Sequence, residues 1–322
     1  MKFFIELPTW LGDAVMVTPA LLLIIENYPA ADITLFGSKV AVETLKLFPN
    51  VKNIVIDNTK KGNRILNIRN LTRKLEKFDV AITFRTSLFS KLLIKNINSK
   101  IKIGSQNFLS GFFFSHSIKI SKNIHQVERY VELIRPLLKE DLKTPDLKLF
   151  NSVEKFSKKT VGINPGAAYG SAKRWFPERF GEVALKLSEN YDILIFGVDS
   201  EIDSCNIIEK VLKEHGVENF KNLCGKTTIL ELIQKIGGLD LFITNDSGPM
   251  HIAAAYKIPT IAIFGPTDFR YTSPWKNENA IIVRDNTLKC SPCMKRVCPL
   301  KHHECMSNIR SEKILDIINY DL

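Results

Sequence analysis

The chain of 322 residues lacks a hydrophobic run long enough to cross a membrane. Such a span needs roughly 18 or more consecutive apolar residues, and Glu6 and Pro8 interrupt the apolar N-terminus at once. No small-residue cleavage site follows. We therefore expect no signal peptide and a protein that stays in the cytosol.

Common cofactor signatures are missing too. The turn after the first predicted strand reads TWLGD, not the G-x-G-x-x-G of dinucleotide-binding folds. The stretch from Gly225 to Thr227 resembles the end of a P-loop, but the glycine required five positions earlier is Phe220. A D-x-D carboxylate pair is also lacking, so we expect no obligatory divalent metal and no other required cofactor.

Acidic residues are comparatively scarce, since 45 Lys and Arg face 34 Asp and Glu and give a formal charge of +11. With 45% apolar and 25% charged residues, the composition is otherwise that of an ordinary globular protein. The excess of basic over acidic residues favours an anionic partner such as nucleic acid, a phosphorylated substrate or an acidic membrane surface. A basic but inert surface would have the same composition.

Predicted strands alternate with helical patterns in two series. The strands expected are 2–7, 32–36, 54–56, 80–83 and 101–104, then 160–164, 192–196, 241–244, 260–264 and 280–283. Residues 180–189 and 229–236 are examples of the helices. The alternation predicts the α/β class, with two doubly wound domains at 1–150 and 151–322 joined by the polar segment 151–159. Ligands of such sheets bind at the carboxyl ends of the strands, so we expect a cleft site between the domains.

Residues 244–251 (TNDSGPMH) join a predicted strand to a predicted helix over 249–256. A junction of this kind directs free backbone N–H groups and the helix dipole toward a bound anion. Gly248 would let a phosphate approach the main chain. The alternative is an ordinary N-cap formed by Asp246 or Ser247.

In two further stretches a predicted strand is again followed by a turn and a predicted helix. Residues 161–167 (VGINPGA) are followed by Lys173 and Arg174, an ammonium and a forked guanidinium that suit a diphosphate. The alternative is a solvated pair before a helix that begins at Pro177. Near the N-terminus, Asp13 follows Gly12 at the start of an apolar helical pattern. It is either a general base at the mouth of a cleft or an N-cap.

Together the three stretches resemble the heptosyltransferases of glycosyltransferase family 9, which build the lipopolysaccharide core. LGDAVM with TPA, NPGA with AKRW, and NDSGPMH match the opening, central and donor-loop motifs in that order. The central motif is most like that of heptosyltransferase II. The resemblance implies a GT-B fold of two Rossmann-like domains facing across a cleft, with the acceptor on 1–150 and ADP-heptose on 151–322.

It also implies inverting transfer of L-glycero-D-manno-heptose from ADP-heptose to the first heptose of the inner core. The acceptor would be heptosyl-Kdo lipid A, and nucleic acid is not an expected partner. A basic enzyme with this substrate would lie peripherally, by electrostatics, on the inner face of the cytoplasmic membrane. Heptosyltransferase I, a relative with another donor or acceptor, and a non-catalytic sugar-nucleotide-binding protein stay open.

The expected site residues follow from the motifs and the resemblance. The catalytic residues expected are Asp13 and Lys173. The donor-binding residues expected are Gly166, Lys173, Arg174, Gly197, Glu201, Thr227, Thr228, Asp246, Ser247, Gly248 and His251. The acceptor-binding residues expected are Thr9, Trp10, Gly12, Arg85 and Arg129. A core position suits His251 equally well.

Four of the six cysteines lie close together: Cys290, Cys293, Cys298 and Cys305. The C-x-x-C spacing suits zinc, but six residues separate the last pair instead of two to four. We expect reduced, packed thiols, with structural zinc as the alternative. The apolar segment 109–114 (LSGFFF) is expected in the core rather than at a membrane.

Overall fold

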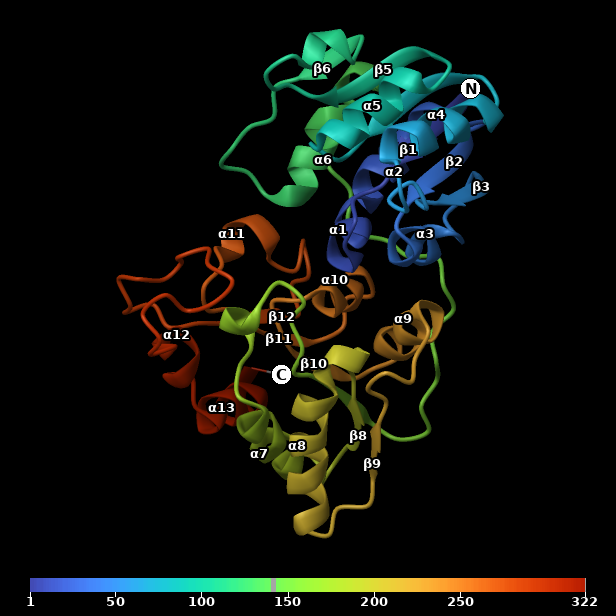
Figure 1. Cartoon of the computed structure of the whole chain (residues 1–322). Helices are drawn as coiled ribbons and strands as arrows, with labels where there is room; N and C mark the ends of the chain where they lie inside the picture. The colour runs from blue at the N-terminus through green and yellow to red at the C-terminus, as the bar shows by residue number, and fades with distance from the viewer. Residues whose placement is uncertain (140–142, 322) are drawn as a thin grey trace. The chain divides into compact units, whose positions relative to one another are not determined.

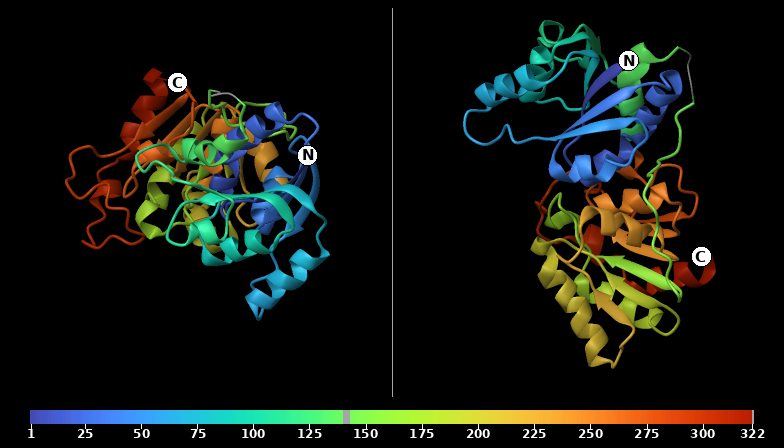
Figure 2. Two further views of the ribbon diagram at one scale, coloured as in Figure 1. Left: turned by 90° about the horizontal axis from the view of Figure 1, so that it is seen from above. Right: turned by 90° about the vertical axis from the view of Figure 1, so that its right-hand side faces the viewer.

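The computed structural model describes residues 1–139 and 143–321, and it divides into two compact units, Met1–Phe150 and Asn151–Leu322 (Figure 1). The division falls where the sequence changes from one strand series to the next. Each unit contains a six-stranded parallel sheet with helices between successive strands (Figure 2).

The sheet of unit 1 has the order β3-β2-β1-β4-β5-β6. Its strands are β1 (Lys2–Glu6), β2 (Asp32–Gly37), β3 (Val51–Ile56), β4 (Phe78–Thr83), β5 (Ser99–Ser105) and β6 (His116–Ile118). Its helices are α1 (Leu11–Met16), α2 (Thr18–Asn27), α3 (Lys39–Leu45), α4 (Arg64–Lys74), α5 (Leu88–Asn96) and α6 (Gln126–Ile134), with the 3₁₀ turns η1 (Ser110–Phe112) and η2 (Arg135–Leu137). The chain order reverses at β1, between β2 and β4, which is where ligands of doubly wound sheets bind.

Strand β1 is central, and its apolar run is continuous because both faces of a parallel sheet are covered. Phe3, Phe4 and Ile5 are completely buried. The Phe4 ring packs on Phe36 and Phe78, with centroids 5.7 and 5.5 Å away. The residues that follow β1 are therefore held on a rigid strand.

The sheet of unit 2 has the order β12-β11-β10-β7-β8-β9. Its strands are β7 (Thr160–Asn164), β8 (Asp192–Ile195), β9 (Phe220–Asn222), β10 (Leu241–Asn245), β11 (Thr260–Ile263) and β12 (Ala280–Val283). Its helices are α7 (Pro177–Leu187), α8 (Ile202–Glu214), α9 (Ile229–Gly237), α10 (Gly248–Ala255), α11 (Phe269–Thr272), α12 (Glu304–Ser307) and α13 (Ser311–Asp321), with η3 (Ser171–Lys173) and η4 (Asp199–Glu201).

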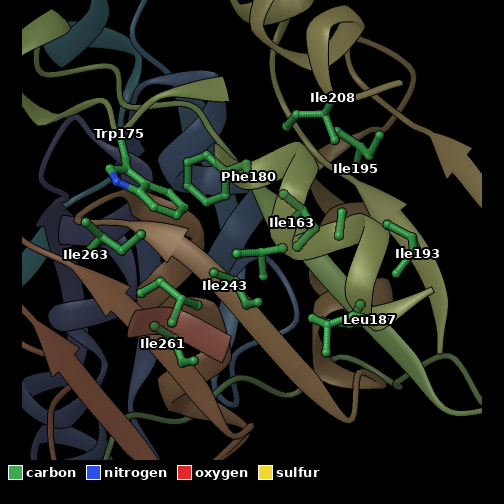
Figure 3. Close-up of a cluster of buried hydrophobic side chains, with 14 of the residues drawn as sticks. Ile163, Trp175, Phe180, Leu187, Ile193, Ile195, Ile208, Ile243, Ile261 and Ile263 are labelled. Atoms are coloured by element: carbon green, nitrogen blue, oxygen red, sulfur yellow. The ribbon is translucent and has the colours of Figure 1, made fainter. Parts of the chain in front are cut away.

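The core of unit 2 is built on Trp175, which is completely buried (Figure 3). Its ring meets Phe180 edge-on, with centroids 4.8 Å apart. Its indole N–H donates to the carbonyl of Ile309 at 2.8 Å. This bond satisfies the one polar group of the buried indole and ties the C-terminal segment to the loop before α7.

All ten expected strands are present, and two more were missed. Both β6 (HSI) and β9 (FKN) are three-residue strands at a sheet edge, without an apolar run to signal them. Helix α7 begins at Pro177, as predicted. Across 1–139 and 143–321, no helix has the length and apolarity needed to span a bilayer.

Candidate functional site

Asp13 lies in the first turn of α1, immediately beyond the loop that follows β1. The N-cap position is Trp10, so the N-cap interpretation of Asp13 is wrong. The hydroxyl of Tyr130, on α6, donates to Asp13 Oδ1 at 2.8 Å. This bond occupies one carboxylate oxygen and fixes the orientation of the other, as a general base requires.

Tyr130 is itself firmly placed. It is buried, and its ring meets Phe84 edge-on with centroids 5.4 Å apart. Burial, and next the negative charge of Asp13, raise the pKa of Tyr130 well above its ordinary value. The phenol therefore stays protonated and acts as a donor to Asp13 at every pH of interest.

A second polar cluster lies at the carboxyl end of β1. The buried carboxylate of Glu6 accepts hydrogen bonds from Thr83 Oγ1 at 2.6 Å, Ser90 Oγ at 3.0 Å and Arg85 Nη1 at 3.3 Å. Burial raises the pKa of Glu6, and these three donors oppose the rise. Arg85 Nη1 also lies 3.9 Å from Asp57 Oδ2. Arg85, expected to contact the acceptor, is thus engaged by two carboxylates of its own unit.

The other residues expected to bind the acceptor are found on two elements. Thr9, Trp10 and Gly12 surround the start of α1, where the Trp10 side chain is 58% exposed and Gly12 is buried. The Thr9 carbonyl accepts from Ser38 Oγ at 2.7 Å. Arg129 is half-buried on α6, next to Tyr130 in the chain. Helix α6 packs against α1, so both groups belong to one region of unit 1.

In unit 2, Lys173 and Asp246 form a buried ion pair between Nζ and Oδ2. Lys173 is 8% exposed and Asp246 4%. Thr267 Oγ1 donates to the same carboxylate oxygen at 2.6 Å, and the Tyr169 ring centroid lies 4.8 Å from Nζ. The structure thus contradicts the solvated-pair alternative for Lys173, because its ammonium is buried in an ion pair.

Helix α10 begins at Gly248 with Ser247 in the N-cap position. The Ser247 hydroxyl makes no capping bond. It bonds instead to Thr244 Oγ1 at 3.0 Å and to Asn164 Nδ2 at 3.2 Å. Ser247 therefore occupies the N-cap position, as the N-cap alternative predicted, but its side chain does not cap the helix. An anion site at the start of α10 stays a prediction.

Gly166 and Glu201 are in direct contact. A Cβ on Gly166 would lie 2.0 Å from Glu201 Oε2, so a larger residue there would force the Glu201 carboxylate to move. Glu201 is buried, and its Oε2 accepts from the amide of Val198 at 3.0 Å. Gly197 is equally confined, because a Cβ there would lie within 2.8 Å of the Cys205 and Cys224 sulfurs. The loops after β7 and β8 are thus packed together.

The remaining residues expected to bind the donor lie on or near α9, α10 and the loop before α7. Thr228 is the N-cap of α9 and forms a capping box with Glu231, in which the Thr228 amide donates to Glu231 Oε2 at 2.8 Å. Thr228 thus has a structural role, Thr227 precedes it half-buried, and donor binding by both stays a prediction. Arg174 Nε donates to the Ala167 carbonyl at 3.4 Å. His251 is 3% exposed on α10.

The four clustered cysteines all line one small cavity of about 30 Å³. The cysteines are free, and burial followed by the three neighbouring thiols raises the pKa of Cys305 to about 11. Over residues 1–139 and 143–321, no set of three or more His, Cys, Asp and Glu side chains is arranged to hold a metal ion.

Comparison with known proteins now decides the family. A model described as glycosyltransferase family 9 (heptosyltransferase) matches residues 68–304. The lipooligosaccharide heptosyltransferase 2 of Campylobacter jejuni is 45% identical, over 98% of this chain and 97% of that protein. The chain belongs to glycosyltransferase family 9. It is a glycosyltransferase, as the sequence motifs predicted.

Solved structures of the family share the fold. The Escherichia coli ADP-heptose lipopolysaccharide heptosyltransferase II matches with a TM-score of 0.83 at 23% identity, over 99% of this chain and 98% of that one. The Escherichia coli heptosyltransferase WaaC with ADP-2-deoxy-2-fluoro heptose matches with a TM-score of 0.79 at 17% identity, over the full length of both chains. The GT-B fold class is thereby confirmed.

The family's central and donor-loop motifs are connected by a residue that sequence reasoning did not single out. Asn245 is completely buried at the end of β10. Its Oδ1 accepts from the Trp175 amide at 3.0 Å, and its Nδ2 donates to the Pro165 carbonyl at 2.7 Å. One amide side chain thus fixes both loops against the donor-loop motif. Its position inside that motif was the available signal.

Tyr130 and Thr267 were also missed. Tyr130 is 117 residues from Asp13 in the chain, and Thr267 is 21 residues from Asp246. Neither lies in a motif of the family quoted above. A tyrosine in an amphipathic helix and a threonine in a loop after a strand carry no sequence signal of a polar partner.

Proposed function

We propose that this glycosyltransferase is an inverting heptosyltransferase II. It would move L-glycero-D-manno-heptose from ADP-heptose to the first heptose of the inner core of lipopolysaccharide or lipooligosaccharide. The observation that carries the proposal is the 45% identity, over nearly the whole of both chains, to lipooligosaccharide heptosyltransferase 2. The oriented carboxylate of Asp13 supplies the chemistry that this transfer needs.

The acceptor half of the reaction is assigned to unit 1. Asp13 takes the proton of the acceptor hydroxyl as its oxygen forms a bond to the anomeric carbon. The bond between that carbon and the diphosphate oxygen breaks, and ADP leaves with the electron pair. A direct displacement inverts the anomeric centre without a covalent intermediate. Tyr130 acts through Asp13, because its hydrogen bond to Oδ1 holds the carboxylate in one orientation.

The donor half is assigned to unit 2. The departing diphosphate gains negative charge, which preorganised donors stabilise. The start of α10 at Gly248 and the guanidinium of Arg174 are the groups proposed for this role. The ammonium of Lys173 is proposed to join them by moving from Asp246 to the diphosphate. Asp246 is proposed to orient the sugar, and Glu201 the ribose. We propose no metal or organic cofactor for the reaction.

The substrate class suggests a location. A lipid-linked acceptor and a formal charge of +11 suit a peripheral enzyme on the inner face of the cytoplasmic membrane. This location and the identity of the acceptor are part of the proposal.

The test measures ADP release from ADP-heptose by the purified protein, with and without heptosyl-Kdo lipid A. Acceptor-dependent release is expected. The Asp13→Asn variant should be slower by about 10²–10⁴-fold, the usual contribution of a general base. Asp203→Asn, at an exposed position of α8, is the matched control and should keep full activity. The anomeric configuration of the product, read by NMR, tests inversion.

Other outcomes have defined meanings. Release only with unheptosylated Kdo-lipid A would make the protein heptosyltransferase I. Silence with both acceptors would contradict the proposal and favour another sugar donor or a binding role. Equal activity of Asp13→Asn and Asp203→Asn would remove Asp13 as the base.

A further inference from the structure

The loop between β5 and β6, residues 106–115, exposes large apolar side chains. Phe108 is 88% exposed and Phe112 70%, the two highest values for large hydrophobic residues in the described parts of the chain. Leu109 between them is 63% exposed. Segment 109–114 was expected in the core, and for Leu109 and Phe112 that prediction is wrong. Contiguous exposed apolar side chains mark an interaction surface.

The loop is nonetheless held in place by one buried side chain and by hydrogen bonds. Phe114 is buried, and its ring lies against Gly104 of β5 so closely that a Cβ there would be 2.2 Å from it. The buried Ser110 amide donates to the Asn107 carbonyl at 3.1 Å, and Lys91 Nζ donates to Asn107 Oδ1 at 2.5 Å. One phenylalanine anchors the loop in the core, which holds the exposed apolar side chains in place before any partner arrives.

The sequence on both sides of this loop is rich in cations and lacks acids. The 48 residues from 80 to 127 contain seven Lys or Arg and no Asp or Glu. The seven are Arg85, Lys91, Lys95, Lys100, Lys102, Lys119 and Lys122. Lys95 Nζ lies 3.2 Å from the centroid of the Phe112 ring. Lys102 Nζ donates to the Lys95 carbonyl at 2.6 Å, which places two ammonium groups beside the loop.

In the described parts of the chain Lys95 and Lys102 form no ion pair, whereas Lys100 pairs with Asp79 at 3.1 Å. Burial, and next the charge of Lys95, lower the pKa of Lys102, so the cations repel one another. An external anion would relieve this repulsion. A surface that combines exposed aromatic rings with unneutralised lysines suits the boundary between acyl chains and phosphate headgroups.

We propose that the 106–115 loop docks on an anionic phospholipid bilayer. Phe108, Leu109 and Phe112 enter the interfacial region, and Lys95 and Lys102 bind headgroup phosphates. A second copy of the chain is a poor occupant, since it would bring two clusters of positive charge together. The inference deepens the proposed function, whose acceptor is carried on lipid, by assigning the contact to one loop of unit 1.

The test measures sedimentation of the full chain with vesicles of phosphatidylcholine, with or without phosphatidylglycerol. Binding is expected only when the anionic lipid is present. Phe108→Ser and Phe112→Ser should each lower the partition coefficient about tenfold. Burying a side chain of this size raises that coefficient by about a factor of ten or more. Lys95→Gln should lower it about fivefold at low salt, the effect of one lysine near such a surface.

Val297→Ser is the matched control, since Val297 is 67% exposed in unit 2 and should leave the partition coefficient unchanged. Raising the salt concentration should abolish the Lys95→Gln difference and preserve the Phe108→Ser difference. A tryptophan introduced by Phe108→Trp should shift its emission to the blue only with the anionic vesicles. That signal reports insertion without removing an apolar side chain.

Three results would overturn the inference. They are no binding of the wild-type chain to anionic vesicles, equal binding of the phenylalanine variants, and conversion of a dimer to a monomer by Phe108→Ser with vesicle binding intact. Transfer to a water-soluble, deacylated acceptor is measured in parallel and should be unchanged in the loop variants. Failure of that transfer in the wild type counts against the proposed transferase activity, and failure of vesicle binding counts against the docking loop and the proposed membrane location.

Discussion

Replacing Lys173 by methionine removes the positive member of the buried ion pair in unit 2. Asp246, 4% exposed, would keep the hydrogen bond from Thr267 at 2.6 Å but lose its counter-charge. Breaking a buried pair from one side costs about 3–5 kcal/mol, because an uncompensated charge is left in a poorly solvated site. We expect the unfolding free energy of unit 2 to fall by about this amount.

The same reasoning applies from the other side. Asp246→Asn leaves the Lys173 ammonium without its carboxylate and should cost a similar amount. The double variant Lys173→Met/Asp246→Asn leaves no unpaired charge, so it should be less destabilised than either single variant. The resulting coupling energy should exceed about 2 kcal/mol, well above the roughly 0.5 kcal/mol within which independent sites add.

Urea unfolding followed by tryptophan fluorescence measures these values. The chain has three tryptophans, and replacing Trp10 and Trp275 by phenylalanine leaves the buried Trp175 as a reporter of unit 2. A single reporter matters because two units need not unfold together.

Lys186→Met is the control for the loss of an ammonium. Lys186 pairs with Glu189 on the surface of unit 2, where both side chains are more than half exposed. Such pairs contribute at most about 1 kcal/mol. Additive effects of the two single changes, or a loss for Lys173→Met no larger than for Lys186→Met, would refute the reasoning.

Three further predictions concern substitutions of single residues. Tyr130→Phe should lower kcat about tenfold, because the lost hydroxyl no longer holds the Asp13 carboxylate in place; a kcat equal to that of the wild type would leave Tyr130 a purely structural role. Burial raises the pKa of Glu6 above its ordinary value of 4.5. The stability that Glu6 contributes is therefore present below pH 4.5 and lost as the pH rises through the folded value. Thermal unfolding of Glu6→Gln should lack this decline, and a decline equal to that of the wild type would contradict the assignment. Gly166→Ala forces a Cβ against the neighbouring carboxylate, so calorimetry should show ADP binding weakened about tenfold, on the order of 1.4 kcal/mol. Gly111→Ala, with open space around it, should bind ADP like the wild type.

The positions of the site loops could be predicted from the sequence for a physical reason. A buried parallel strand is a continuous apolar run, and small or polar residues after it mark the sheet edge where ligands bind. Asn164, Asn245 and the residues after Glu6 all follow this rule. The edge strands β6 and β9 were not predicted, because a three-residue strand that is half exposed has no continuous apolar run.

Polar partners could not be predicted, because they depend on packing between distant segments. The Lys173–Asp246 pair spans 73 residues and the Tyr130–Asp13 bond 117. Similarly, the run of three phenylalanines gave no indication of which ring points inward. Only Phe114 is buried, because it alone meets Gly104 of the neighbouring strand.

The buried ion pair also changes how an anion would be attracted to unit 2. Lys173 and Asp246 together carry no net charge, so they offer a diphosphate little long-range attraction. That attraction then falls to Arg174, which donates to a carbonyl and not to a carboxylate, and to the start of α10, where Ser247 makes no capping bond. Lys173 can contribute only by moving its ammonium from Asp246 toward the ligand. Because that exchange frees Asp246 to accept hydroxyl groups, the proposed roles of these two residues in binding diphosphate and sugar are coupled to each other.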